Sequence, residues 1–324
     1  MLSPDETASL LPYPALADAI RDAALALRDG RLRATPRTVL PLPGEAGGTL
    51  LAMPAADEDL TITKLVTVHP ENAGLGLPTI QGEVVVMRTA TGERLGILDG
   101  ATVTARRTAA LSLLAARELA PRPGEPLLIV GAGAQGRAHL EAFREGIGVS
   151  EVFLFSRTRE RAEALADHAR SLGMEARAVD SAEEALERAT LIVTATTSGE
   201  PVLPEEIPED TFVAAVGSFT PEAAEIPASL VVRSTVVVDT LEGAKEEAGD
   251  LLLAEKAGAF RWENATALEE ALSWQKAPRG TVLFESVGHA AWDLASGHTA
   301  FGDQEGSPRF VTRIGREMSD ETLV

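Results

Sequence analysis

The chain has 324 residues, of which 45% are hydrophobic and 24% charged, so it is long enough to bury the cores of about two globular domains. A net charge of −20 argues against a nucleic acid or an anionic membrane as partner, because both would repel the protein. The absence of cysteine excludes disulfides, thiolate metal sites and a cysteine nucleophile. No signal-peptide pattern and no membrane-length apolar run is found, so we expect a cytoplasmic protein.

The first 120 residues predict two helices with a group of antiparallel strands between them. Apolar residues at helical spacing indicate a helix over residues 14–30, and Gly30 is a natural C-terminal stop. Short segments rich in β-branched residues then predict strands at residues 38–42, 49–53, 61–68, 83–88 and 94–98. A long helix over residues 102–120 is expected to connect the two regions of the chain.

Beyond a break rich in Pro and Gly at residues 121–126, strands alternate with helices, as a parallel sheet requires. The predicted strands are residues 127–130, 151–155, 175–179, 191–196, 212–216, 235–239 and 281–285. Ser181-Ala182-Glu183-Glu184 has the form of a capping box. A helix is predicted at 241–257, with its charged residues on a solvated face (Lys245, Glu246, Glu247, Asp250). A last helix is predicted at 288–297. The fold class is therefore α/β, with an antiparallel region before a parallel one.

A glycine motif follows the first strand of the second region. Residues 127–130 are apolar and run directly into Gly131-Ala132-Gly133-Ala134-Gln135-Gly136. The first glycine permits a tight turn, the second lets the backbone approach a pyrophosphate, and the third allows the helix to pack closely on the strand. We predict that Gly131, Gly133, Ala134, Gln135 and Gly136 bind a dinucleotide rather than form an ordinary glycine-rich loop.

The end of the next strand indicates which dinucleotide. An NAD site usually has Asp or Glu here to bind the ribose 2′-hydroxyl, but this chain has Ser156-Arg157-Thr158. Hydroxyls and a guanidinium group suit the 2′-phosphate of NADPH, with NADH a weaker alternative. In the competing interpretation, Arg157 and Arg159 merely begin an exposed helix.

Thr196 and Thr197 end a later strand, at the edge where open α/β sheets bind ligands. They are expected to contact the ribose or nicotinamide, unless they only form a turn. The histidines are dispersed along the sequence and show no metal-ligand spacing, so no metal site is predicted.

Several motifs, in the same order along the chain, resemble the ornithine cyclodeaminase/mu-crystallin family. They are Thr35-Pro36-Arg37, TKLVTVHPEN at 63–72, GLPTIQG at 76–82, Leu98-Asp99-Gly100, Arg107-Thr108-Ala109-Ala110, and the glycine motif with Ser156-Arg157-Thr158. The resemblance covers about residues 5 to 300. It implies a Rossmann NADP-binding domain at 119–299 and a discontinuous α+β substrate and dimerisation domain at 1–118, completed by about 300–324. It also implies a homodimer.

Within the family, the chain most resembles bacterial reductases of cyclic imino acids. The resemblance implies NADPH-dependent reduction of Δ1-pyrroline-2-carboxylate or Δ1-piperideine-2-carboxylate to L-proline or L-pipecolate. The family's cyclodeaminases carry an Asp in a Gly-Gly-Asp run after a late Rossmann strand. This chain reads Val216-Gly217-Ser218-Phe219 there, with Phe219 at about the Asp position, which disfavours cyclodeamination.

The resemblance also assigns roles to individual residues. Arg37 and Arg107 are candidates for holding the substrate carboxylate, because a guanidinium group can bind it bidentately. Lys64 is the candidate that polarises the substrate or delivers a proton, with a pKa lowered by the two arginines. The further candidates are Gln81, Ser286 and Gly288 for the substrate, Thr108 and Val216 for the cofactor, and the carboxylates of Glu225 and Asp293 as support.

Two features oppose these roles, and three further functions stay open. A strand lysine is usually exposed, and because Arg106 precedes Arg107 on one helix, one of the two should face solvent. An amino-acid dehydrogenase acting on pyruvate and ammonia would use the same residues. An ornithine cyclodeaminase is the second open function, and a non-catalytic, NADPH-dependent binding protein of the mu-crystallin kind is the third.

Overall fold

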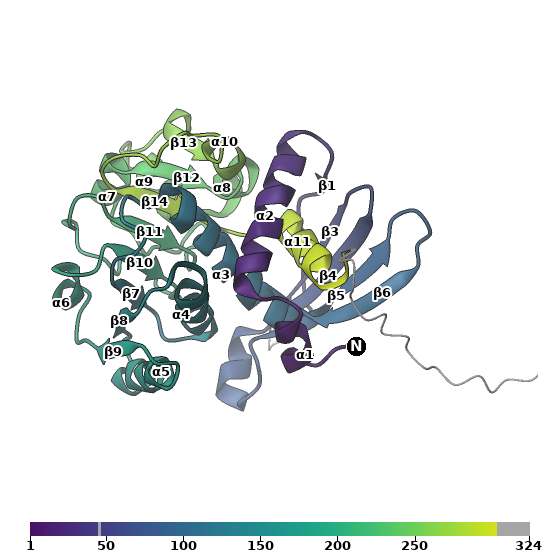
Figure 1. Cartoon of the computed structure of the whole chain (residues 1–324), viewed down its shortest axis with the longest axis horizontal. Helices are drawn as coiled ribbons and strands as arrows, with labels where there is room; N and C mark the ends of the chain where they lie inside the picture. Colours follow the sequence, from purple (N-terminus) through teal and green to yellow (C-terminus); the bar gives the residue numbers. More distant parts are fainter. Residues whose placement is uncertain (45–46, 303–324) are drawn as a thin grey trace, which may run out of the picture.

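The computed structural model describes residues 1–44 and 47–302. Figure 1 shows two units beside each other, one built around an antiparallel sheet and one around a parallel sheet, with α3 (Gly100–Leu119) between them. The expected α/β fold class, with a Rossmann-type domain and an α+β domain, is confirmed. No helix in the described ranges is long and apolar enough to cross a membrane.

The first unit is a six-stranded antiparallel sheet with helices on one face. Its strands are β1 (Arg33–Ala34), β2 (Thr38–Pro41), β3 (Thr49–Ala56), β4 (Leu60–Val68), β5 (Ile80–Arg88) and β6 (Arg94–Asp99), and η1 (Pro70–Leu75) joins β4 to β5. Neighbours follow the order β1-β3-β4-β5-β6, with β2 also paired to β3. The helices are α1 (Pro4–Ser9), α2 (Tyr13–Arg28), α3 and α11 (Ala290–Phe301).

Side-chain alternation on β4 determines which residues enter this core. Leu60, Ile62, Lys64 and Val66 are all buried, whereas Leu65 is 42% exposed on the opposite face. Because successive strand residues point to opposite faces, Lys64 must share the inward face with Ile62 and Val66. A lysine therefore lies inside the core that α11 covers.

The second unit is an eight-stranded parallel sheet in the order β13-β12-β14-β11-β10-β7-β8-β9. Its strands are β7 (Leu127–Val130), β8 (Glu151–Phe155), β9 (Glu175–Ala178), β10 (Leu191–Thr194), β11 (Phe212–Ala215), β12 (Thr235–Val238), β13 (Ala265–Ala267) and β14 (Val282–Glu285). The helical segments are α4 (Ala134–Ile147), α5 (Arg159–Ser171), α6 (Glu183–Leu186), α7 (Ala228–Arg233), α8 (Leu241–Glu247), α9 (Gly249–Lys256), η2 (Trp262–Asn264) and α10 (Leu268–Ala271). The strand order reverses between β7 and β10, which places the ligand crevice at the carboxyl ends of these strands.

The last described helix returns to the first unit. After β14 the chain leaves the parallel sheet, and α11 packs against α2, β3 and β4 (Figure 1). The segment that rejoins the antiparallel sheet therefore begins at Ala290, earlier than the expected position at about residue 300. The domain limits themselves stay a prediction, and residues 303–324 lie outside the described part of the chain.

Three local predictions were wrong. Residues 241–257 form two helices, because the chain leaves the helical conformation at Ala248 with ψ of 90°. Asp250 is buried, not solvated, because it accepts hydrogen bonds from the backbone of Glu225 and Ile226. Ser181 does not form a capping box, since α6 begins after Ala182 and no side chain caps it.

Candidate active site

The glycine turn between β7 and α4 has the geometry that a dinucleotide needs. Gly131 has a φ of +116°, and a Cβ there would lie 2.3 Å from the carbonyl oxygen of Ala195. A Cβ on Gly136 would lie 1.9 Å from the carbonyl oxygen of Gly131, so only glycine permits this contact between helix and turn. Gly133 is different, because it is the N-cap residue just before α4 and a Cβ there would face open space. A pyrophosphate can therefore approach the helix N-terminus, near Ala134 and Gln135.

At the end of β8, two arginines have different surroundings. Arg159 is bound by Glu163 and Asp180 on the same surface. Arg157 is exposed and has no hydrogen bond or ion pair within the described residues, and it stands between Ser156 and Thr158. Arg157 is therefore the guanidinium group that is available for a 2′-phosphate.

The other expected cofactor residues lie along the carboxyl edge or on α3. Thr196 and Thr197 follow β10, and Val216 follows β11 with its backbone N–H bonded to Thr194. Thr108 is buried on α3, where its hydroxyl donates to the carbonyl of Thr104. The N–H of Thr196 donates to Glu225, so this group is already occupied.

The centre of the candidate site is a buried group of three charged residues. Lys64 Nζ lies 2.8 Å from Asp293 Oδ2 and 3.0 Å from its Oδ1. Arg107 Nε lies 3.3 Å from the same Oδ1. All three side chains are at least nine-tenths buried, and they come from β4, α11 and α3. One carboxylate therefore faces two cations, which leaves a net positive charge for an anionic substrate.

Burial lowers the pKa of Lys64 to about 8, and Arg107 adds to this effect while Asp293 opposes it. The sequence favours the neighbouring arginines as the main cause of a lowered pKa, but desolvation of the ammonium group is the larger effect. Lys64 is thus able to give up a proton near neutral pH. Arg106, the other candidate on α3, packs its guanidinium group over the ring of Tyr13 and donates to the carbonyl of Leu11.

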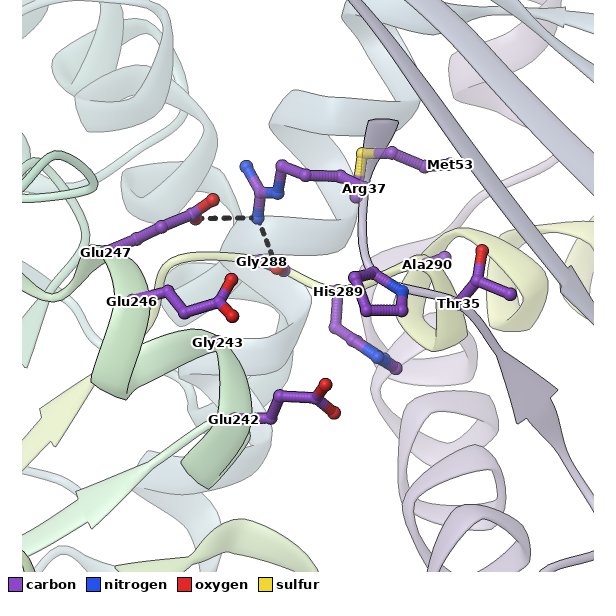
Figure 2. Close-up of a pocket in the computed structure, with 11 residues that line it drawn as sticks. Thr35, Arg37, Met53, Glu242, Gly243, Glu246, Glu247, Gly288, His289 and Ala290 are labelled. Atoms are coloured by element: carbon purple, nitrogen blue, oxygen red, sulfur yellow. Dashed lines mark hydrogen bonds and ion pairs between the residues drawn. The ribbon is translucent and has the colours of Figure 1, made fainter. Parts of the chain in front are cut away.

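Arg37 is close enough to help lower the pKa of Lys64, but its own contacts are with other groups of the protein, and Figure 2 shows those with Gly288 and Glu247. Its Nη2 donates to the carbonyl oxygens of Val287 at 2.9 Å and Gly288 at 2.6 Å, and forms an ion pair with Glu247 at 3.1 Å. These contacts join the loop before β2 to α8 and to the β14–α11 loop. One nitrogen carries all of them, so the rest of the guanidinium group can still bind a carboxylate.

The loop between β14 and α11 is held by a carboxylate that the sequence did not indicate. Asp239 Oδ2 accepts from the Ser286 hydroxyl at 3.0 Å and from the Gly288 N–H at 2.7 Å. A Cβ on Gly288, which has a φ of +88°, would lie 2.8 Å from both terminal nitrogens of Arg107. Ser286 and Gly288 therefore position the arginine, and the hydroxyl of Ser286 is already used by Asp239.

Gln81 is not brought into this cluster. It pairs with Thr67 on the face opposite to Lys64, and its side chain is exposed. The alternation on β5 already places Gln81 on that face, because the inward residues there are Val84 and Val86. The sequence suggests Asp293 only as a supporting carboxylate, and no local pattern marks it as the partner of Lys64.

The arrangement can bind a small carboxylate beside a proton donor at the edge of a dinucleotide site. Arg107 and Lys64 supply the positive charge, and Lys64 can release a proton. The loop after β14 contacts Arg107 at Gly288, and the loops after β10 and β11 leave the same carboxyl edge of the sheet. Such a site suits hydride transfer to a C=N or C=O carbon adjacent to a carboxylate.

Comparisons with known proteins agree with this chemistry. The chain matches the model of the ornithine cyclodeaminase/mu-crystallin family over residues 1–302. It is 40% identical over 297 residues to Delta(1)-pyrroline-2-carboxylate reductase 1 of Burkholderia multivorans, covering 91% of this chain and 93% of that protein.

Two solved structures resemble the chain over nearly its whole length. The first is the Delta(1)-pyrroline-2-carboxylate reductase of Thermococcus litoralis in complex with NADH and L-proline, with a TM-score of 0.82, 30% identity and 92% coverage of both chains. The second is an archaeal alanine dehydrogenase dimer with bound NAD, with a TM-score of 0.81, 29% identity and coverage of 91% and 92%.

Proposed function

We propose that this chain, which belongs to the ornithine cyclodeaminase/mu-crystallin family, reduces a cyclic α-imino acid to the corresponding L-amino acid with NADPH. Its relatives make the protein an imine reductase that uses a nicotinamide dinucleotide. The substrates that we propose are Δ1-pyrroline-2-carboxylate and Δ1-piperideine-2-carboxylate. The observation that carries the proposal is the buried group of Lys64, Arg107 and Asp293 beside the carboxyl edge of the Rossmann sheet.

Each group at the site would have its own role in the reaction. The bound cofactor would supply hydride to the imine carbon. Arg107, with the unoccupied part of Arg37, would hold the substrate carboxylate and so fix the position of the ring. Lys64 would keep the imine nitrogen protonated, because its ammonium group can transfer a proton at near-neutral pH.

Turnover assays with several substrates test this function. We expect loss of NADPH absorbance with both cyclic imino acids, and little with pyruvate plus ammonia. Lys64→Ala should lower kcat/KM by about 10²–10⁴, the usual contribution of a general acid. The exposed Lys245→Ala is the matched control and should be close to wild type.

Each competing function has its own outcome in these assays. Faster turnover of pyruvate and ammonia would favour the amino-acid dehydrogenase, and proline formation from ornithine would favour the cyclodeaminase. The latter is disfavoured by Phe219, which is 47% exposed on the loop after β11 and has no charge to offer the substrate amine. Tight NADPH binding without turnover of any imine would favour a binding protein.

The preference for NADPH rests on Arg157. We predict that Arg157→Ala raises the KM for NADPH about tenfold or more and leaves the KM for NADH unchanged, since only NADPH carries the 2′-phosphate. Arg159→Ala is the control, because that side chain already pairs with Glu163 and Asp180. Equal KM values for NADPH in the two variants would contradict the assignment.

We also propose that the protein is a homodimer that associates through the outer face of the antiparallel sheet. The apolar residues there include Leu40, Leu50, Leu65, Val85 and Ile97, with Leu40 53% exposed and Leu65 42% exposed. A sheet face of this composition needs a partner, because it presents several adjacent apolar side chains to water. A second copy would cover it symmetrically.

A further inference from the structure

A buried glutamate joins two loops of the candidate cofactor site. Glu225 is fully buried in the segment that follows β11. Its Oε1 accepts the backbone N–H of Thr196 at 2.6 Å. Its Oε2 accepts the backbone N–H of Gly217 at 2.7 Å and the hydroxyl of Thr194 at 3.0 Å. Both oxygens are therefore acceptors, and each binds a different loop.

These two loops are the ones that follow β10 and β11 at the carboxyl edge of the sheet. They pack directly on the carboxyl group, since a Cβ on Gly217 would lie 2.6 Å from the carboxyl carbon of Glu225 and 2.2 Å from the carbonyl oxygen of Thr196. One carboxylate thus joins the two loops beyond the last backbone bond between their strands, from Val216 to Thr194. A change in the geometry of the Glu225 carboxylate would therefore change the affinity for a ligand that lies across both loops.

The backbone of Glu225 is itself fixed by hydrogen bonds to Asp250. Asp250 Oδ1 accepts the backbone N–H groups of Glu225 at 2.7 Å and Ile226 at 2.9 Å. Asp250 stands in the first turn of α9, and the N–H of Gly249 donates to the carbonyl of Ser218 at 3.0 Å. Burial raises the pKa of Glu225 to about 7, while the bonds from Thr196 and Gly217 stabilise the carboxylate.

We propose that Glu225 is a positioning residue that sets the spacing of the loops after β10 and β11, and thereby the affinity for the nicotinamide half of the cofactor. The inference rests on the cofactor part of the proposed function. It does not depend on which imine is reduced. The N–H groups of Thr196 and Gly217 are consumed by Glu225, so the cofactor would contact other atoms of these loops.

The geometry explains why a carboxylate, and not an amide of equal size, is needed. In Glu225→Gln, one end of the side chain becomes an NH₂ donor. If the NH₂ takes the place of Oε1, it faces the N–H of Thr196, and if it takes the place of Oε2, it faces the N–H of Gly217. Either orientation leaves one loop N–H opposite another donor, which breaks one of the two bonds.

The test is the dissociation constant for NADPH, measured by fluorescence titration without any imine. We expect Glu225→Gln to weaken NADPH binding about tenfold or more, and the KM of the imine to stay within about twofold of wild type. Asp57→Asn is the control, because Asp57 is also a partly buried carboxylate that accepts a backbone N–H, from Leu60, and it pairs with His298 in the antiparallel unit, away from both loops. The control should bind NADPH about as well as wild type.

A milder variant keeps the proposal testable if Glu225→Gln does not fold. Thr194→Val removes one hydrogen bond to Glu225 and keeps the backbone N–H bonds from Thr196 and Gly217, so we expect roughly two- to fivefold weaker NADPH binding, measured well below the unfolding midpoint of the variant. Unchanged NADPH affinity in the Glu225 and Thr194 variants would overturn the proposal. Equal losses in Glu225→Gln and Asp57→Asn would also overturn it, as a general effect of losing a carboxylate charge. A wild-type protein that binds NADPH but reduces no imine would refute the proposed reaction and leave this inference standing.

Discussion

At the scale of single residues, the site depends on a buried lysine and its carboxylate. Burial disfavours the charged form of Lys64, and Asp293 is the group that restores part of the lost stabilisation. The folded pKa of about 8 is therefore a balance between these two effects. Asp293 touches neither substrate nor cofactor in the proposed reaction, and it acts through Lys64 and Arg107.

Removing this carboxylate should move the pH dependence of the reaction. Without Asp293, the ammonium form of Lys64 loses its counter-ion, so the pKa falls further below about 8 and the proton donor is lost at lower pH. We predict that Asp293→Asn shifts the alkaline limb of kcat/KM to lower pH and lowers the rate about tenfold near the wild-type pKa. The limb would be measured from pH profiles with saturating NADPH.

Asp57→Asn is the control for that experiment, because it removes a carboxylate that pairs with His298 of α11, away from Lys64. Its pH profile should match wild type. An alkaline limb that stays in place in Asp293→Asn would mean that a different group supplies the proton.

At the scale of elements, the β14–α11 loop links the parallel sheet to the helix that carries Asp293. Gly288 contacts the guanidinium group of Arg107 in a left-handed conformation, so a side chain would be unfavourable for two separate reasons. We predict that Gly288→Ala lowers stability by about 1–3 kcal/mol and raises the KM of the imine. Gly280→Ala has the same kind of backbone, with a φ of +79°, but faces open space. It should lose stability with no change in KM, and a similar rise in KM would contradict the role of the Arg107 contact.

The elements also show what the sequence could and could not predict. The strands of both sheets and the glycine turn follow from local patterns, because β-branched runs and glycine spacing act over a few residues. The burial of Lys64 was not predicted, because a strand lysine is usually exposed, although its alternation with Ile62 and Val66 puts it on their face of the strand. Glu247 and Asp250 were misplaced on a solvated face, because a charged residue in a helix looks exposed unless its distant partners, Arg37 and the backbone of Glu225, are known.

At the scale of the whole molecule, the exposed apolar face of the antiparallel sheet is the surface through which we propose that two copies associate. We predict that Leu40→Lys combined with Leu65→Lys converts the proposed dimer to a monomer, because four buried charges would face each other across a two-fold interface. Light scattering after size-exclusion chromatography would report the mass. Val232→Lys is the control, since Val232 is 58% exposed on α7, outside this face. A dimer that survives the double substitution would place the interface elsewhere.

Lys64 and Asp293 are 229 residues apart in the chain, and this separation has a consequence for biosynthesis. A ribosome that adds about 5–20 residues per second would incorporate Lys64 roughly 10–50 s before Asp293, its counter-ion. Until then, the antiparallel unit lacks both α11 and the charge that makes a buried lysine tolerable. The N-terminal unit therefore cannot complete its core while the parallel sheet is still being made. A chain interrupted anywhere between the parallel sheet and α11 would contain an intact glycine turn and no assembled lysine site, so cofactor binding would arise during synthesis before the ability to use it.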